Sequence, residues 1–155
     1  MLFVFALSLP ANAQVPELQT TFPAKAVSRL HEMRCAFPEG PGSSRIPGLI
    51  QGKFRQSARI DWAFLCARGQ EITLAVFFSD SELNVTEMRK SFAGDGVHLT
   101  PREITTAPKK FIIERCDSSL DRIPPIDHDG ILDMTAKPVV HYYYQGKWLD
   151  LAVAR

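Results

Sequence analysis

Apolar and polar residues alternate over a long central stretch, and this alternation limits the fold more than any other feature of the chain. Every second position of 49–55 is apolar or glycine, and residues 60–66 continue the same period. After a turn signal at Gly69, residues 72–78 form a third apolar run. A period of two residues is typical of strands with one buried face. We therefore expect an antiparallel meander over residues 49–78.

The C-terminal region predicts a β-hairpin. Residues 139–144 and 147–153 are rich in β-branched and aromatic side chains, and only Gln145 and Gly146 separate them. A two-residue connection ending in glycine is typical of a tight hairpin turn.

One helix is expected before these strands, over residues 22–34. Apolar side chains recur there at helical spacing, at Phe22, Ala26, Leu30 and Met33. A short helix after Pro108 is also favoured, although residues 111–113 fit a buried strand as well. Residues 80–105 fit neither period, and we assign no element to them. The predicted class is α+β, with the N-terminal helix packed on a mainly antiparallel sheet that contains the meander and the C-terminal hairpin.

The first residues resemble a signal peptide. An uncharged apolar run over residues 2–9 ends at Pro10, and Ala11-Asn12-Ala13 follows, which is the small-residue pattern that a signal peptidase accepts. We expect cleavage after residue 13, which leaves 14–155 as a single exported α+β domain, periplasmic or secreted, without a membrane span. No basic residue precedes the apolar run, so a buried N-terminal strand is the alternative.

Three cysteines then suggest one disulfide and one remaining thiol, because thiols oxidise in exported proteins. We favour Cys35 with Cys66, and Cys66 with Cys116 is the main rival. A metal site built from the three thiolates is less consistent with the sequence, since no C-x-x-C spacing is present.

The charge balance excludes one class of partner. The chain carries 18 basic and 17 acidic residues, a formal net charge of +1. Binding to nucleic acid requires a clustered excess of Lys and Arg, so we expect no nucleic-acid partner.

The strongest candidate for a chemical site is a cluster of acidic residues near the C-terminus. Asp127, Asp129 and Asp133 surround Gly130 in a D-x-D-G-x-x-D pattern. Calcium binds carboxylates and carbonyls presented by such a loop, and a calcium site is therefore expected as one interpretation. The pattern lacks the first Asp and the final Glu of an EF-hand. The alternative is an Asx-type turn, in which the aspartates bind backbone amides.

Two further interpretations involve the same region. His128 with Asp127 or Asp129 could act as a general base in a small periplasmic hydrolase, but no nucleophile, zinc-helix or phosphate-loop motif accompanies it. The side chains of His128, Tyr142, Tyr144 and Trp148 could instead form a surface for a protein, peptide or carbohydrate ligand. Alternation along a strand places Tyr142 and Tyr144 on the face opposite to His141 and Tyr143, so one of the two sets is expected in the core.

Two stretches of the chain resemble a family of exported bacterial proteins with no assigned activity. The first has a G-x-F…DWA-x-LC signature at residues 52–66, and the second has DHDGI-x-D…HYYY-x-G-x-W at residues 127–148. The chain is also distantly similar to FG-GAP and VCBS-type repeats, but residues 55–59 offer no carboxylate where those repeats bind calcium. The resemblance implies export without implying a reaction. We therefore expect a non-catalytic extracytoplasmic binding or envelope-associated module.

Overall fold

The computed structural model describes residues 23–36, 48–79, 85–92, 103–116, 124–134 and 137–154. The predicted signal peptide lies outside these residues. The elements follow one another in the order α1 (Ala24–Glu32), β1 (Leu49–Gly52), β2 (Asp61–Arg68), β3 (Glu71–Phe77), β4 (Val85–Phe92), β5 (Glu103–Ala107), α2 (Lys109–Arg115), β6 (Gly130–Met134), β7 (Val139–Tyr144) and β8 (Lys147–Ala152).

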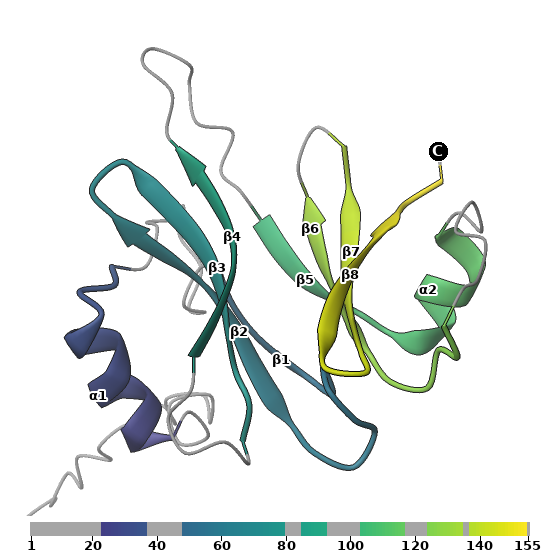
Figure 1. The fold of residues 1–155 in the computed structure, drawn as a ribbon, viewed down its shortest axis with the longest axis horizontal. Helices are drawn as coiled ribbons and strands as arrows, with labels where there is room; N and C mark the ends of the chain where they lie inside the picture. Colours follow the sequence, from purple (N-terminus) through teal and green to yellow (C-terminus); the bar gives the residue numbers. More distant parts are fainter. Residues whose placement is uncertain are drawn as a thin grey trace, which may run out of the picture.

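The strands form two antiparallel sheets (Figure 1). In the N-terminal sheet the strands lie in the order β1-β2-β3-β4, and in the C-terminal sheet in the order β5-β6-β7-β8. Each sheet is thus a meander built from one contiguous half of the chain. The predicted meander forms β1 to β3 and the predicted hairpin forms β7 and β8, but the two belong to different sheets.

The predicted α+β class is wrong. The described chain is mainly β, with two four-stranded sheets and two helices of 9 and 7 residues. The expected helices are present as α1 and α2, but the stretch without an assigned element contributes β4 and the start of β5. The alternating pattern identifies which side chains of a strand are buried. It does not show that the strands divide into two sheets that pack face to face. No helix in the described ranges is long and apolar enough to cross a membrane.

The main core lies between the two sheets. Its N-terminal-sheet side is formed by side chains of β2, β3 and the segments that follow β1 and β3, and Ile104 and Ile131 contribute from the C-terminal sheet. The sheets are joined beside β1 and β5, where the Thr106 hydroxyl donates to the Gln51 carbonyl at 2.8 Å. A Cβ at Gly52 would lie 3.0 Å from the Thr106 methyl group, so glycine permits this close approach.

A smaller apolar cluster covers the outer face of each sheet, beside the helix that Figure 1 shows there. Ala26 and Leu30 of α1 pack with Phe64, Cys66, Ala75 and Phe77 on the N-terminal sheet. On the C-terminal sheet, Ile112 of α2 packs with Ala107, Val140, Tyr142 and Leu151. The two helices have only 9 and 7 residues. Each therefore covers part of one sheet face and does not form a layer of its own.

Two glycines of the C-terminal sheet serve different purposes. Gln145 and Gly146 have φ values of 48° and 81°, so both central residues of the β7–β8 turn adopt the left-handed conformation that a two-residue hairpin requires. Gly130 has no positive φ, and a Cβ there would lie 2.6 Å from Val140 Cγ1. Gly130 is therefore required for space at the start of β6 and not for a left-handed backbone conformation.

Candidate functional site

The segment that precedes β6 is organised around the hydroxyl of Tyr142. Tyr142 is fully buried on β7, and its hydroxyl oxygen accepts the Asp127 backbone N–H at 3.1 Å. The hydroxyl proton lies within reach of two acceptors, the Pro125 carbonyl at 3.1 Å and Asp127 Oδ1 at 3.0 Å. Burial raises the pKa of this phenol above its ordinary value. The hydroxyl thus holds residues 125–127 against the outer face of the C-terminal sheet.

His128 continues this arrangement and is almost completely buried. Its ring stacks on Tyr142 with centroids 4.3 Å apart and planes 12° apart. Nδ1 lies 2.9 Å from the Asp129 carbonyl oxygen, and Nε2 lies 2.9 Å from the Tyr143 carbonyl oxygen. Asp127 Oδ1 is 3.7 Å from Nε2. Because both ring nitrogens already face backbone acceptors, His128 is not positioned as a base toward a substrate.

The three aspartates expected to bind calcium point to different places. Asp127 contacts the Tyr142 hydroxyl, whereas Asp129 Oδ2 accepts the Lys53 backbone N–H at 3.0 Å, and the Asp129 N–H donates to the Lys53 carbonyl at 3.1 Å. Asp133 on β6 is fully buried, and its side chain lies next to that of His141 on β7. No group of three potential metal ligands occurs within the described ranges. The Asp129 carboxylate thus binds a backbone amide of the distant residue Lys53, whereas the Asp127 carboxylate accepts from a side-chain hydroxyl, and the local Asx-type turn stays a prediction.

A second buried imidazole connects three strands of the C-terminal sheet. His141 on β7 is 2% exposed, with Nδ1 2.6 Å from Asp150 Oδ1 on β8 and Nε2 3.4 Å from Asp133 Oδ2 on β6. The Asp150 side chain is 62% exposed, so the row extends from the core to solvent. Asp133, His141 and Asp150 together are called the Asp-His-Asp row below.

Of the four residues expected to form a ligand surface, His128, Tyr142 and Tyr144 lie on the outer face of the C-terminal sheet, and Trp148 lies on the other face. Tyr142 is fully buried, and His128 is covered by its neighbours. Tyr144 pairs with Lys147 and Trp148 with Tyr143, so the side chains of Tyr144 and Trp148 are on opposite faces of the hairpin. Trp148 lies against the main core, where its ring stacks on Phe78 at 6.1 Å.

The predicted pairing of Cys35 with Cys66 is confirmed, because the structure contains this disulfide. Cys66 is fully buried on β2, and Cys35 follows α1, so the bond fixes the helix end to the sheet. Two backbone hydrogen bonds between Ala36 and Ala67, of 3.0 and 2.8 Å, support the same junction. Cys116 is the free thiol, and its partial burial raises its pKa above the ordinary value.

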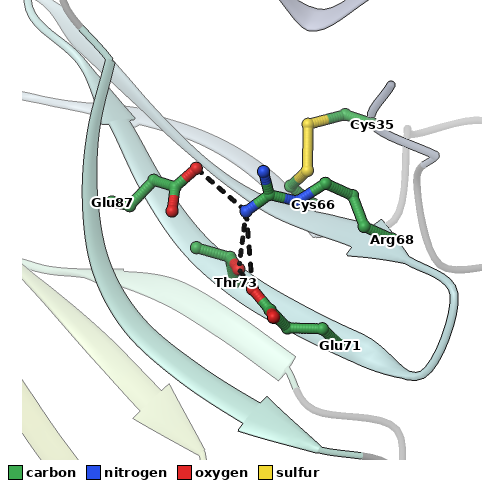
Figure 2. Close-up of a disulfide and its surroundings, with 6 residues drawn as sticks. All are labelled: Cys35, Cys66, Arg68, Glu71, Thr73 and Glu87. Carbon is green, nitrogen blue, oxygen red and sulfur yellow. Dashed lines mark hydrogen bonds and ion pairs between the residues drawn. A yellow bond between two sulfur atoms is a disulfide. The ribbon is translucent and has the colours of Figure 1, made fainter. Parts of the chain in front are cut away.

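Figure 2 shows a polar cluster beside the disulfide on the outer face of the N-terminal sheet. Arg68 Nη2 donates to Glu87 Oε1 at 2.9 Å and reaches Glu71 Oε1 and Thr73 Oγ1 at 3.4 Å each. The buried Thr73 hydroxyl donates to Glu71 Oε1 at 3.0 Å. The guanidinium thus connects β2, β3 and β4 next to the covalent bond.

No family model, curated protein or solved structure matches the chain. The resemblance to exported bacterial proteins therefore stays a prediction, and the function must be argued from the geometry.

Sequence reasoning missed two features of this geometry. The first is the Asp-His-Asp row, although His141 and Asp150 are equally distant from the predicted two-residue turn, and this symmetry would have paired them. The second is Asp61, whose buried carboxylate accepts the N–H of Arg55 at 3.2 Å and that of Ser79 at 3.0 Å. No local pattern indicates these two partners, because both depend on how the chain folds back.

Proposed function

We propose that this protein is a non-catalytic module that works outside the cytoplasm, in the periplasm or after secretion, by binding a protein or peptide. The Cys35–Cys66 disulfide carries the proposal. Reducing compartments keep most protein thiols free, whereas exported domains retain such bonds. Here the bond includes the sulfur of the fully buried Cys66 and links the end of α1 to the sheet. The packing of α1 on the sheet is therefore complete when the two cysteines are oxidised.

The bond also has a substantial expected effect on stability. The two cysteines are 31 residues apart, and closing a loop of that length restricts the unfolded chain by roughly 3 to 4 kcal/mol in the chain-entropy model. Small domains are stable by only about 5 to 15 kcal/mol. Loss of the disulfide would therefore remove a large share of the stability, which favours a working environment where the bond persists.

The buried histidines support a binding role over hydrolysis. Both ring nitrogens of His128 face backbone carbonyls, and both ring nitrogens of His141 face carboxylates. A general base must present a nitrogen within hydrogen-bond reach of a substrate proton. Cys116 is a poor nucleophile as well, because its raised pKa lowers the thiolate fraction. We find no observation that favours a hydrolase built on His128 with Asp127 or Asp129.

The edge of the C-terminal sheet is the surface that best fits a partner. β8 is the outer strand of this sheet in the described chain, and a bridge from Cys116 to Val153 lies just beyond its end. An extended peptide can add to such an edge through backbone hydrogen bonds. A partner bound in this way would contact β8 between Lys147 and Leu151.

Thiol labelling tests the proposed compartment. Tagged full-length protein is expressed in its native host, trapped with acid, and treated with a large maleimide before and after reduction. We expect one labelled cysteine before reduction, Cys116, and three afterwards. Cys116→Ala is the matched control and should show none before reduction and two afterwards. Three reactive thiols before reduction, in protein recovered from the cytoplasm, would refute the proposal.

Site-specific photo-crosslinking tests the proposed surface. A photoreactive residue replaces Leu149 on β8, and the control places it at Lys110, whose side chain on α2 is 84% exposed. A discrete adduct from position 149 and none from position 110 is the expected result. Equal adducts from both positions, or none from 149, would count against β8 as the contact surface.

A further inference from the structure

The outer side of β8 is followed by backbone that already pairs with another segment. β8, the yellow strand beside the C-terminus in Figure 1, pairs with β7 on one side, and no other described strand lies along it. Just beyond β8, the Val153 N–H donates to the Pro138 carbonyl on the β7 side at 3.3 Å. The next amide, that of Ala154, donates to the Arg115 carbonyl at 2.7 Å, beside an antiparallel bridge from Cys116 to Val153. The end of this strand thus accepts an antiparallel segment on its outer side.

The same alternation along β8 leaves two residues whose backbone faces outward. The pairing of β7 with β8 keeps one register throughout. Neighbouring residues of an antiparallel strand direct their backbone groups to opposite sides. Because the Val153 amide faces β7, that of Leu149 does so as well. The N–H and C=O groups of Trp148 and Asp150 therefore face outward, as a template to which an extended peptide can add. We call residues 147–150 the β8 edge.

The side chains of the β8 edge present opposite charges at fixed positions. The Asp150 side chain is 62% exposed, so its carboxylate is accessible to solvent although Oδ1 lies 2.6 Å from His141 Nδ1. Lys147 is exposed at the start of the strand, and Leu149 between the two charges is half-buried. Side chains alternate along a strand, so Lys147 and Leu149 lie on the outer face of the sheet with Tyr142, and Asp150 lies on the other face.

These positions define the peptide that fits the β8 edge, and the inference rests on the proposed binding function. We propose that the β8 edge binds an antiparallel peptide segment with the order basic, apolar, any residue, acidic. The basic residue lies opposite Asp150, the apolar residue opposite Leu149 and the acidic residue opposite Lys147. Side chains that lie directly opposite each other in an antiparallel pair interact, and opposite charges stabilise the pair whereas like charges destabilise it. The antiparallel bridge beyond β8 gives the direction.

A second copy of the chain fits the β8 edge less well than such a peptide. When two β8 strands pair antiparallel, residues whose backbone faces outward must lie opposite each other. Asp150 then lies opposite another outward residue, such as Trp148 or the second Asp150. Lys147 never lies opposite Asp150, because the backbone groups of these two residues face different sides. Self-pairing therefore supplies no cation opposite the carboxylate, and one register places like charges together, which is destabilising.

Amide hydrogen exchange on the full oxidised chain tests the backbone contact first. The probe is a blocked synthetic peptide, glycine-threonine-lysine-valine-threonine-glutamate-glycine, added at millimolar concentration. At saturation, protection of the Trp148 and Asp150 amides should rise by about fivefold, the factor expected for one added hydrogen bond. The Leu149 amide, which faces β7, should change far less. Binding that leaves the Trp148 and Asp150 amides unchanged, or no binding of this peptide, would overturn the proposal.

The order of charges is tested with a second peptide, in which the lysine and the glutamate are exchanged and every other residue is kept. Titration followed by NMR of the 15N-labelled chain gives both dissociation constants. We expect the exchanged peptide to bind about fivefold more weakly, because both charge pairs become repulsive. The preference should decrease at high salt, since the charges are exposed. Equal affinities at low salt would overturn the proposed order of residues.

Variants assign the preference to individual side chains. Asp150→Asn keeps an oxygen toward His141 and removes the negative charge, so it should lower the preference to about twofold. Glu114→Gln on α2 is the matched control and should leave the preference unchanged, because its side chain is 57% exposed and lies on another element. If Asp150→Asn does not fold, Lys147→Glu at its exposed position should lower the preference as well. An unchanged preference in the folded variants would overturn the proposal.

The outcomes separate this inference from the proposed function. A discrete photo-crosslinked adduct from position 149, together with equal affinities for the two peptides, would refute the inference and leave the proposed function in place. No adduct from position 149 and no binding of either peptide would refute both. Protection of the Trp148 and Asp150 amides in the free protein would mean that the β8 edge is already occupied, by a second copy if the protection grows with protein concentration, and would overturn the inference.

Discussion

The two sheets have the same strand number and the same meander topology, but different chemistry holds them together. The N-terminal sheet is joined to α1 by the Cys35–Cys66 disulfide, and the polar cluster of Arg68, Glu71, Thr73 and Glu87 lies beside that bond. In the C-terminal sheet, α2 makes no covalent link, and the buried Tyr142 hydroxyl, His128 and the Asp-His-Asp row join the elements. One architecture can thus be secured by a covalent bond that reductants break or by buried side-chain hydrogen bonds.

Removing the disulfide should have the largest effect on stability and should act through the N-terminal sheet. We expect Cys35→Ala with Cys66→Ala to lower the free energy of unfolding by roughly 3 to 4 kcal/mol, because the unfolded chain regains the entropy of an open loop. Urea denaturation at fixed pH measures the loss. Cys116→Ala is the control and should cost less than about 1 kcal/mol, since its half-buried thiol closes no loop. Equal losses would show that the disulfide does not stabilise the N-terminal sheet in the way described.

Gly130→Ala should destabilise the C-terminal sheet strongly, although it adds a single methyl group. The new Cβ would lie 2.6 Å from Val140 Cγ1 and 3.0 Å from the His141 carbonyl oxygen, so β6 and β7 must separate. Overpacking of this kind costs about 1 to 3 kcal/mol. The double variant with Val140→Ala relieves the shortest of these contacts and should recover part of the loss in thermal denaturation. A neutral single substitution would contradict the close approach of β6 to β7.

Tyr142→Phe tests the buried hydrogen bonds of the C-terminal sheet separately, because it removes one hydroxyl group and leaves the N-terminal sheet unchanged. The Asp127 amide would lose its acceptor, so we expect a loss of about 1 to 2 kcal/mol and faster amide exchange at residues 125–127. The matched control is Tyr144→Phe, whose hydroxyl accepts a hydrogen bond from the exposed Gln145 side chain at 3.2 Å. It should cost less than about 0.5 kcal/mol.

The same tyrosine also predicts an alkaline limit. Burial raises the folded-state pKa of Tyr142 above its ordinary value of 10.0, so the stability that the neutral phenol contributes is complete below that value. It is lost as the pH rises through the folded pKa. Tyr142→Phe should remove this part of the alkaline denaturation, which denaturation at a series of pH values measures. An unchanged alkaline profile would mean that folding does not change the pKa of Tyr142, which would contradict this prediction.

The smallest effect is expected in the polar cluster of Figure 2. Arg68 and Glu87 are about one-third exposed, and ion pairs of this kind contribute about 0 to 1 kcal/mol. Arg68→Gln should therefore lower the thermal midpoint slightly at low salt and have no measurable effect at high salt. A loss as large as that of the disulfide variant would show that the polar cluster, and not the covalent bond, secures the N-terminal sheet.

Much of the local structure could be predicted from the chain, and the tertiary arrangement could not. Helical and alternating periods identified α1, β1 to β3 and the β7–β8 hairpin, because these patterns depend on neighbours in the sequence. The division into two sheets was missed, since a strand's pattern does not specify which edges pair.

The candidate site shows the same limit. The D-x-D-G-x-x-D pattern suggested a calcium loop, but the partner of Asp129 is the backbone of Lys53, which is 76 residues away. Asp133 belongs to the Asp-His-Asp row, which lies on the face of the C-terminal sheet opposite to the Tyr142 side chain. Spacing within a motif cannot reveal partners of this kind, because packing between distant segments determines them.

Hydrogen exchange of both sheets in one sample, under two separate perturbations, tests the central claim most directly. A reductant at constant pH should lower protection in β2 and β3 more than in β7 and β8. The substitution Tyr142→Phe in the oxidised protein should reverse that order, because it removes the buried hydroxyl that holds the Asp127 amide. If each perturbation lowered protection equally in both sheets, the two halves would not be held by different chemistry.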